Sequence, residues 1–312
     1  ACNVTRMISV LNDHVMDRLL KLLEKELGKA PLPFSWLLFG SAGRHELVFK
    51  SRQTNGILYG NSPDETISRE AEKYFRTLSE RAVKHLVACG YPSDAGDITA
   101  SSIKWRQPQS VWDTYFRGWC GFHDREENFD PAVFFDLRSG AGSASLAEKL
   151  KEQVHALTRE NEQFLRYLVQ YCATVEPPMS FYGNSVVEKD GQYGETLDLD
   201  GRGLAFFVDF ARAMSLKYGI CNTNTLERFR SLIEKQHMPN DLGSELVEAY
   251  ELLSHIKLVH QLHLIEDGQK PDNSIRPDDL SDLEKQTLKE VFEVIRRLQG
   301  FARLEFGFPK KP

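Results

Sequence analysis

The sequence predicts an α/β (α+β) fold, in which a small mixed sheet with helices is followed by a mainly α-helical bundle. Short apolar runs bounded by glycine and proline lie before residue 142, and long stretches with helical spacing of apolar residues follow it. The 312 residues, 41% of them hydrophobic, can bury two modest cores. We therefore expect one domain over residues 1–142, including an N-terminal helix, and a helical domain over residues 143–312.

The expected elements of the first domain follow from local patterns. Residues 8–27 have apolar side chains at helical spacing and end at a glycine. Residues 34–39 and 56–59 are short apolar runs, which predict two buried strands. A helix is expected over residues 68–89 with Ser68 as its cap, and a third strand over residues 132–137 that ends in a turn.

The second domain is expected to be helical apart from one hairpin. Lys189-Asp190-Gly191 lies between two runs of strand-forming residues and predicts a turn within residues 180–199. The expected helices cover residues 146–172, 204–218, 225–235, 242–266 and 283–306.

Bulk composition excludes some classes of function. The net charge of -6 argues against general nucleic-acid binding, which needs a basic surface. No run approaches the roughly 18 apolar residues of a membrane span, and the N-terminus shows no signal peptide. The five cysteines are scattered and form no Cys-x-x-Cys pair, so we expect reduced thiols in a cytoplasmic protein.

The segment Gly40-Ser-Ala-Gly-Arg-His-Glu46 directly follows the first expected strand. A Gly-Ser turn at such a place can bring backbone N–H groups close to a phosphate, because glycine allows a close approach. Arg44 can add a bidentate phosphate contact. Taken alone, such a turn is more often only a turn.

The wider pattern adds to this motif. After the Gly-Ser turn comes Ser51-Arg52-Gln53-Thr54-Asn55, which leads into the second strand. This arrangement resembles the polymerase-beta-like nucleotidyltransferases, and more closely the nucleotidyltransferases related to the N-terminal region of protein-PII uridylyltransferase. The resemblance implies transfer of a nucleoside monophosphate from a nucleoside triphosphate to a hydroxyl of a protein or small molecule. It also implies that Gly40, Ser41, Arg44 and Glu46 contact the nucleotide.

The resemblance extends into the second half of the chain. Residues 196–199, 202–204, 208–212, 224–228, 260–261 and 271–273 look like parts of the family's helical substrate-binding domain. The candidates there are Arg202, Asp209, Arg212, Asn224 and Arg228. They form either a wall that recognises the base or acceptor, or a set of salt bridges and caps between helices.

The sequence departs from the family where metal binding is expected. The family has two aspartates, one residue apart, which hold Mg²⁺ against the nucleotide phosphates. This sequence has Arg52 and Thr54 at those positions. Arg52 repels a cation and Thr54 is a poor ligand. We therefore expect Mg²⁺ binding, and with it transfer, to be weak or lost.

One acidic position of the family remains. Asp136 matches the third acid, which implies a catalytic and metal-assisting role; alternatively it caps a strand end or pairs with Arg138. Asp94 and Asp97 are other acids that can compensate, although a solvated loop is the expectation.

Two functions follow from these residues. The first is a uridylyltransferase-like enzyme with a nucleoside triphosphate and a protein acceptor as partners. The alternative is a catalytically degenerate, nucleotide-binding regulatory module, in which Arg52 beside Arg44 suits a metal-free anion site. The resemblance also implies attached regulatory domains outside this chain. The histidines at 255, 260 and 263 are expected to be structural, and the aromatic residues between 105 and 119 to form core beneath the sheet.

Overall fold

The computed structural model describes residues 2–49, 51–93, 98–121, 130–178, 188–190 and 194–309. The chain forms two compact units, one over Val4–Asn161 and one over Glu162–Pro312 together with Ala1–Asn3. The first unit contains the sheet and the second is mainly helical, which confirms the expected fold class. The division between the units lies at residue 161, later in the chain than the expected boundary near residue 142.

The position of this division has a structural reason. Helix α5 (Ala144–Thr158) packs on the sheet of the first unit, so it belongs with that unit. The expected single helix over residues 146–172 is instead two helices, α5 and α6 (Glu162–Thr174). They are separated by a turn in which the Asn161 N–H donates to the Thr158 carbonyl at 3.0 Å. The Asn161 side chain also donates to the Cys120 carbonyl at 2.9 Å.

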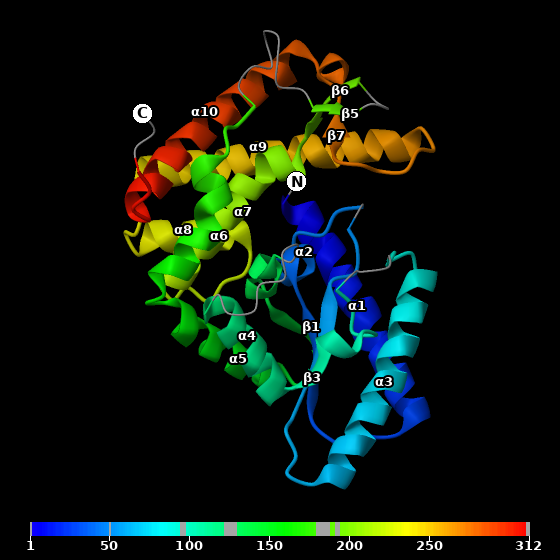
Figure 1. The fold of residues 1–312 in the computed structure, drawn as a ribbon. Helices are drawn as coiled ribbons and strands as arrows, with labels where there is room; N and C mark the ends of the chain where they lie inside the picture. The colour runs from blue at the N-terminus through cyan, green and yellow to red at the C-terminus, as the bar shows by residue number, and fades with distance from the viewer. Residues whose placement is uncertain are drawn as a thin grey trace. The chain divides into compact units, whose positions relative to one another are not determined.

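The sheet of the first unit has four strands in the order β3-β2-β1-β4. These are β1 (Phe34–Leu38), β2 (Asn55–Tyr59), β3 (Arg106–Pro108) and β4 (Arg138–Gly142). Strand β1 pairs antiparallel with β2 and β4, whereas β2 and β3 are parallel. The sheet is therefore mixed, as the sequence predicts (Figure 1).

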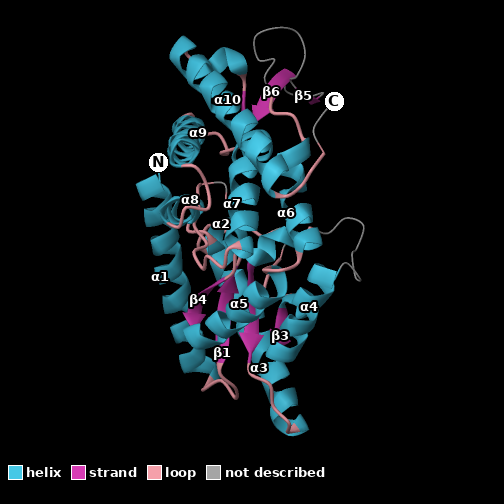
Figure 2. Cartoon of the chain, turned by 90° about the vertical axis from the view of Figure 1, so that its left-hand side faces the viewer, coloured by secondary structure: helices cyan, strands magenta, loops and turns pink. Residues whose placement is uncertain are grey.

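Helices cover both faces of this sheet (Figure 2). Side chains alternate across a strand, so Trp36 of β1 faces α1 (Cys2–Leu27) and α3 (Glu65–Ala88). The core on this face includes Met16, Leu20, Phe75 and Leu78, none more than 3% exposed. Burying each such side chain stabilises the fold by roughly 1.5–3 kcal/mol. Helix α4 (Gln109–Gly121) and α5 contact the strands from the opposite face.

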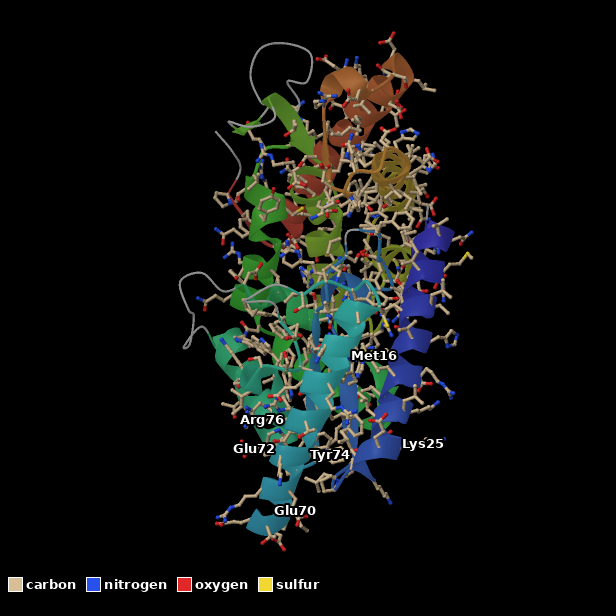
Figure 3. All side chains as sticks on the ribbon, turned by 90° about the vertical axis from the view of Figure 1, so that its right-hand side faces the viewer. Met16, Lys25, Glu70, Glu72, Tyr74 and Arg76 are labelled. Carbon is tan, nitrogen blue, oxygen red and sulfur yellow. The ribbon has the colours of Figure 1, made fainter. Side chains whose placement is uncertain are left out.

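A polar contact joins the outer parts of α1 and α3. Figure 3 shows Tyr74 of α3 near the end of α1 that carries Lys25. The Tyr74 hydroxyl donates to the Gly28 carbonyl at 2.7 Å. This carbonyl belongs to the residue that follows α1, so Tyr74 satisfies an acceptor that the end of a helix leaves open.

The opposite face of the sheet is covered by an aromatic cluster. Trp112 lies with its ring centre 5.6 Å from that of Phe39 and 6.2 Å from that of Trp105. Phe134 contacts Trp105 at 4.6 Å and Trp119 at 4.7 Å. These separations are within the range in which aromatic pairs attract one another. The expectation of an aromatic core beneath the sheet is confirmed.

The prediction of a third strand over residues 132–137 is wrong. Pro131–Phe135 forms the 3-10 helix η2, which is capped by Asp130 through the Ala132 N–H at 2.9 Å. The strand is β4, in the segment where a turn was expected. Gly140 allows it there, because a Cβ on this residue would lie 2.7 Å from the Leu38 side chain. The apolar run is buried in the aromatic cluster without pairing in the sheet.

Other helix ends differ less from expectation. Helix α3 starts at Glu65 rather than residue 68, because Asp64 accepts from the Thr66 N–H at 2.7 Å and caps the helix. Helix α1 starts at Cys2, before the expected residue 8.

In its described residues, the second unit contains the α-helices α6 to α10 and a small sheet in the order β5-β6-β7. The antiparallel pair of β5 and β6 confirms the expected hairpin, although Gly191 lies outside the described residues. No helix in the described ranges is both long and apolar enough to span a membrane. Its α-helices after α6 are α7 (Ala205–Lys217), α8 (Thr225–Glu234), α9 (Asn240–Glu266) and α10 (Asp282–Glu305). Its strands are β5 (Glu188–Asp190), β6 (Gly194–Asp198) and β7 (Ser274–Ile275), and it also has the π-helix η3 (Asp200–Leu204) and the 3-10 helix η4 (Pro277–Asp279). The 3-10 helix η1 (Ile103–Trp105) belongs to the first unit.

Candidate functional site

The turn that follows β1 is the short helix α2 (Gly40–Gly43). Gly40 has a φ of 55°, in the left-handed region that favours glycine. A Cβ on Gly43 would lie 1.7 Å from the backbone oxygen of Asp136, so only glycine permits this approach. The turn therefore packs directly on the segment that carries Asp136. Ser41 lies in the same turn and is partly exposed.

Arg44 links the end of this turn to two carboxylates. Its Nε donates to Oε2 of Glu46 at 2.6 Å, and its Nη1 donates to Oδ2 of Asp136 at 2.6 Å. The side chain of Asp136 is 0% exposed, and those of Glu46 and Arg44 are 9% and 12% exposed. A buried carboxylate is costly unless it is paired and hydrogen-bonded, so Arg44 compensates the charge of Asp136.

This pairing bears on the roles expected for the turn. Arg44 and Glu46 bind each other, and Arg44 also binds Asp136, for which the resemblance implies a role near the metal. The geometry gives Arg44 a positioning role, because it fixes the turn against Asp136. Contact of Gly40, Ser41, Arg44 and Glu46 with a nucleotide stays a prediction.

Arg138 supports the turn from the neighbouring strand β4. Its Nε and Nη2 donate to the carbonyl of Ala42 at 3.0 and 2.8 Å, and Nη2 also donates to Oδ1 of Asp13 at 2.8 Å. The alternative that Asp136 pairs with Arg138 is therefore wrong: Arg138 pairs with Asp13 of α1. Two arginines thus fix α2. Arg44 binds the side chains of Glu46 and Asp136, and Arg138 binds the Ala42 carbonyl of the helix.

The segment before β2 carries Arg52 and Thr54, the two positions at which the resemblance implies aspartates. The Thr54 carbonyl accepts from the Phe39 N–H at 3.1 Å, and the Asn55 N–H donates to the Ile98 carbonyl at 2.8 Å. These bonds hold Thr54 beside the end of β1, from which the Gly-Ser turn starts. The role of Arg52 and Thr54 at this turn stays a prediction.

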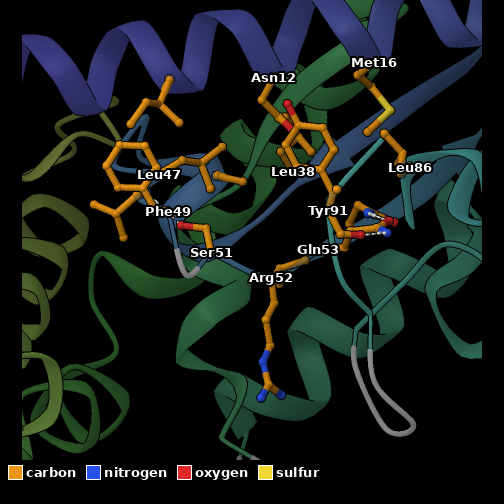
Figure 4. Close-up of a pocket in the computed structure, with 16 residues that line it drawn as sticks. Asn12, Met16, Leu38, Leu47, Phe49, Ser51, Arg52, Gln53, Leu86 and Tyr91 are labelled. Carbon is orange, nitrogen blue, oxygen red and sulfur yellow. Dashed lines mark hydrogen bonds between the residues drawn. The ribbon is translucent and has the colours of Figure 1, made fainter. Parts of the chain in front are cut away.

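Neighbouring side chains of this segment point in different directions. Gln53 and Asn55 are 7% and 1% exposed, and the Asn55 amide donates to Oε1 of Gln53 at 3.3 Å. The Gln53 amide donates to the Tyr91 carbonyl at 2.8 Å. Arg52 is exposed, and in Figure 4 its side chain extends away from Gln53 and Tyr91. Of these two consecutive residues, Gln53 therefore has its amide buried in the first unit, and Arg52 has its guanidinium exposed to solvent.

The residues at this site do not fit a magnesium ion. Arg52 is a cation and Thr54 a neutral group, whereas Mg²⁺ prefers carboxylates together with substrate phosphates. Asp136 is buried and bound by Arg44. Within the described ranges, no three His, Cys, Asp or Glu side chains are grouped to hold a metal ion. Asp94 and Asp97, the acids considered as replacements, lie outside those ranges.

Three of the five candidates in the helical unit lie around Tyr171 of α6. The Tyr171 hydroxyl donates to the Gly201 carbonyl, and the nearby Arg202 and Asp209 act on this hydroxyl electrostatically. Asp209 also pairs with Arg212, whose Nη1 lies 2.8 Å from Oδ1. Burial raises the pKa of Tyr171, and the nearby Arg202 partly opposes this rise. The structure thus brings together Arg202, Asp209 and Arg212.

The other two candidates have local structural contacts. Asn224 caps α8 through the Glu227 N–H at 3.2 Å. Arg228 is 2% exposed, and its Nε donates to the Asn222 carbonyl at 2.9 Å. These contacts match the alternative of caps and helix contacts. A recognition role for any of the five residues stays a prediction.

A second polar cluster in the helical unit was not predicted. Lys257 is 7% exposed and pairs with Asp200, the first residue of the π-helix. Asn273 donates to the other oxygen of Asp200 at 2.5 Å, and Gln261 donates to Asn273 at 2.7 Å. The sequence signal for this cluster is Lys257, a lysine on the buried face of the long helix α9. A buried charge of this kind needs a partner.

One of the three histidines of α9 has a clear structural contact, whereas the role of His255 and His263 stays a prediction. His260 lies 2.9 Å from Oδ1 of Asp272, and the three positions 255, 260 and 263 do not belong to any metal-holding group in the described ranges. A structural role for His260 follows, because it links α9 to the segment before β7.

Comparison with known proteins gives two matches to family models. Residues 1–126 match a family with the description "Putative nucleotidyltransferase DUF294". Residues 162–306 match one with the description "Putative nucleotidyltransferase substrate binding domain". The second match starts at the first residue of the helical stretch Glu162–Pro312. Among curated proteins, no relative matches the chain.

Proposed function

We propose that this chain, which matches the model "Putative nucleotidyltransferase DUF294" over residues 1–126 and that of the "Putative nucleotidyltransferase substrate binding domain" over residues 162–306, binds a nucleoside triphosphate without supporting magnesium-dependent transfer. It then acts as a nucleotide-binding regulatory module. The observation that carries this proposal is the pair Arg52 and Thr54, which stands where the resemblance implies two metal-binding aspartates. One cation and one neutral group cannot hold Mg²⁺ against phosphates.

The position of Asp136 supports the same conclusion. A carboxylate acting as base, or as metal ligand, must reach the acceptor hydroxyl or the ion. Asp136 is fully buried, and one of its oxygens is bound by Arg44 at 2.6 Å. Freeing that carboxylate would break its charge-assisted hydrogen bond with Arg44. We infer that Asp136 is a positioning residue.

The phosphate-binding group in this proposal is Arg52. It is exposed and lies close in sequence to Thr54, which is held next to the end of β1. A guanidinium binds phosphate oxygens in a bidentate manner and carries a permanent charge. Arg52 therefore supplies part of the positive charge that the metal supplies in an active relative. In this proposal, the adjoining turn that contains Gly40 and Ser41 supplies backbone N–H groups to the phosphates.

A uridylyltransferase-like enzyme is the alternative. It is favoured by one observation, the network of Arg44, Glu46 and Asp136, which keeps the family's remaining acid in a defined place. In that reaction an acceptor hydroxyl attacks the α-phosphorus and pyrophosphate leaves. The acceptor would be a protein or a small molecule.

Titration of the whole chain with each of the four nucleoside triphosphates, with Mg²⁺ and with a chelator, tests the proposal. We expect one triphosphate to bind with the same affinity in both conditions, to within about twofold. Arg52→Ala should weaken that binding about tenfold, because a charged hydrogen bond is lost. Arg69→Ala, which removes another exposed arginine of the same unit, is the matched control and should change nothing.

A transfer assay completes the experiment. Incubation with α-labelled triphosphate and Mg²⁺ should release no pyrophosphate above the level without protein. If Mg²⁺ tightens binding tenfold or more, or pyrophosphate is released, the enzyme reading is correct and the regulatory one is wrong. If no triphosphate binds in either condition, both fail.

A further inference from the structure

A cavity of about 170 Å³ lies in the first unit, between the neighbouring helices α4 and α5. The two helices lie side by side in Figure 1 and in Figure 2. The inner wall of the cavity is apolar and includes Phe116 of α4 with Leu150 and Val154 of α5, none more than 2% exposed. The cavity can therefore hold the apolar part of a small ligand.

Two buried oxygen atoms in the lining of this cavity have no hydrogen-bond donor. They are Oδ1 of Asp113 on α4 and Oε1 of Gln153 on α5, and neither has a partner within the described residues. Burial raises the pKa of Asp113, because the carboxylate loses water and gains no donor in return. A buried acceptor without a donor is costly, so the two oxygens favour a ligand that brings N–H groups to both.

Arg117 adds a positive charge where the cavity opens to solvent. It is exposed, it lines the cavity, and it lies one helical turn after Asp113. Side chains four residues apart on a helix are neighbours. The charges of Arg117 and Lys149 lower the pKa of Asp113, but neither residue donates to its Oδ1. The polar lining thus holds one anion with an open acceptor and one cation beside it.

These two charges restrict the ligand. A ligand with only a positive charge would satisfy Asp113 and Gln153 but would be repelled by Arg117. A ligand with only a negative charge would be repelled by Asp113 and would leave both buried acceptors without a donor. A zwitterion avoids both penalties, because its ammonium group can meet the two oxygens while its carboxylate meets the guanidinium in a bidentate manner.

We propose that this cavity binds a small free α-amino acid with an apolar side chain. The ammonium group donates to Oδ1 of Asp113 and Oε1 of Gln153, and the carboxylate accepts from Arg117. The side chain packs against Phe116 and Val154. The size fits, because an apolar cavity of about 150 Å³ in another protein binds benzene, and a branched aliphatic side chain is no larger than that ring.

Calorimetry of the full chain with three compounds of one carbon skeleton tests the ligand class. L-leucine carries both charges, isopentylamine lacks the carboxylate, and isocaproate lacks the ammonium group. We expect leucine to bind about tenfold or more tightly than either, because each of the other two loses charged hydrogen bonds. Absence of leucine binding, or equal affinities of leucine and one of the other compounds, would overturn the proposal.

Two variants assign the ends of the ligand. Asp113→Asn should weaken leucine binding about tenfold without weakening that of isocaproate. Arg117→Gln should weaken leucine binding about tenfold without weakening that of isopentylamine. The matched controls are Asp17→Asn and Arg69→Gln, which change side chains of the same unit that are 43% and 81% exposed and should leave all affinities unchanged. An equal loss for all three compounds in either cavity variant would contradict the assignment.

The open carboxylate has a readout of its own in a thermal melt without any ligand. Burial outweighs the attraction of Arg117 and Lys149 at Asp113, so Asp113→Asn should raise the melting temperature of the ligand-free chain. Leucine should raise the melting temperature of the wild type, and that of the variant by less. A lower melting temperature for ligand-free Asp113→Asn would show that the carboxylate already has a partner, and the proposal would fail. No nucleotide enters these measurements, so their outcome is independent of the function proposed for Arg52.

Discussion

Nη1 of Arg44 donates a 2.6 Å hydrogen bond to Oδ2 of Asp136, a side chain with no exposed surface. The contact joins residues that are far apart in the sequence: one ends the turn after β1, and the other precedes β4. Because β1 and β4 are paired, the bond closes a loop between adjacent strand ends. Its partner Glu46 holds the other side of the same guanidinium. The network therefore sets the shape of the turn.

Removal of this guanidinium should strongly destabilise the first unit. Arg44→Met would remove the charged 2.6 Å partner of the buried Asp136, so the free energy of unfolding should fall by about 3–5 kcal/mol. Asp136→Asn in the Arg44→Met background should recover much of the loss, because the buried charge is gone. Urea unfolding of both variants measures this, with Arg69→Met as the exposed control. A loss below about 1 kcal/mol for Arg44→Met would contradict the pairing.

Two glycines should respond in opposite ways to the same substitution. Gly43→Ala would place a Cβ 1.7 Å from the Asp136 carbonyl oxygen, and backbone must shift to admit it. We expect a loss of about 3 kcal/mol or more. Gly300 lies on the exposed side of α10 with nothing within 4 Å of the added Cβ, so Gly300→Ala should gain about 0.5–1 kcal/mol. Thermal melts measure the change in melting temperature for both variants. Equal changes for Gly43→Ala and Gly300→Ala would contradict this prediction.

The sequence predicts most elements of this fold because their signals are local. Gly28 marks the end of α1, and the apolar run at residues 34–39 marks β1. The run at residues 132–137 carries the same apolar signal but forms a 3-10 helix, because tertiary packing in the aromatic cluster decides its conformation. Such a short apolar run does not reveal whether its backbone pairs with a strand. The glycine-rich segment that does pair looks like a turn in sequence.

The site is less predictable than the fold. The Gly-Ser turn and the neighbourhood of Thr54 follow from order along the chain. The partner of Asp136 does not, because Arg44 and Arg138 both lie within plausible reach and only the three-dimensional register selects between them.

Alkaline pH should destabilise the chain through a buried thiol. Burial raises the pKa of Cys120 to about 12 from its ordinary value of 9.0. The folded state therefore holds the proton more tightly than the unfolded state. This stabilisation is complete below pH 9 and is lost as the pH rises toward 12, by at most about 4 kcal/mol. Unfolding of Cys120→Ala should depend less steeply on pH between 9 and 11 than that of wild type.

The control for this experiment is an exposed thiol. Cys89→Ala removes such a group and should leave the pH dependence of wild type unchanged. Alkylation at neutral pH adds an independent measurement: Cys89 and Cys221 are exposed and should react first, whereas Cys120 should react only on unfolding. Equal slopes for wild type and Cys120→Ala would show that this thiol does not contribute.

Carboxylates at positions 52 and 54 should create magnesium binding. Arg52→Asp together with Thr54→Asp replaces a cation and a neutral group with two anions, one residue apart beside the Gly-Ser turn. Arg52 is exposed, so the first change costs little stability. Asp136 is already bound by Arg44, so the new pair must hold the ion with the triphosphate, which two carboxylates can do. In a thermal melt, Mg²⁺ with triphosphate at about 100 times Kd should stabilise the double variant by about 2.7 kcal/mol.

Arg52→Asn with Thr54→Asn removes the same groups without adding charge and should gain nothing from Mg²⁺. If the wild type or the asparagine variant gains as much from Mg²⁺ and triphosphate as the aspartate variant, the metal is held elsewhere, and the idea of a lost site at Arg52 and Thr54 is wrong.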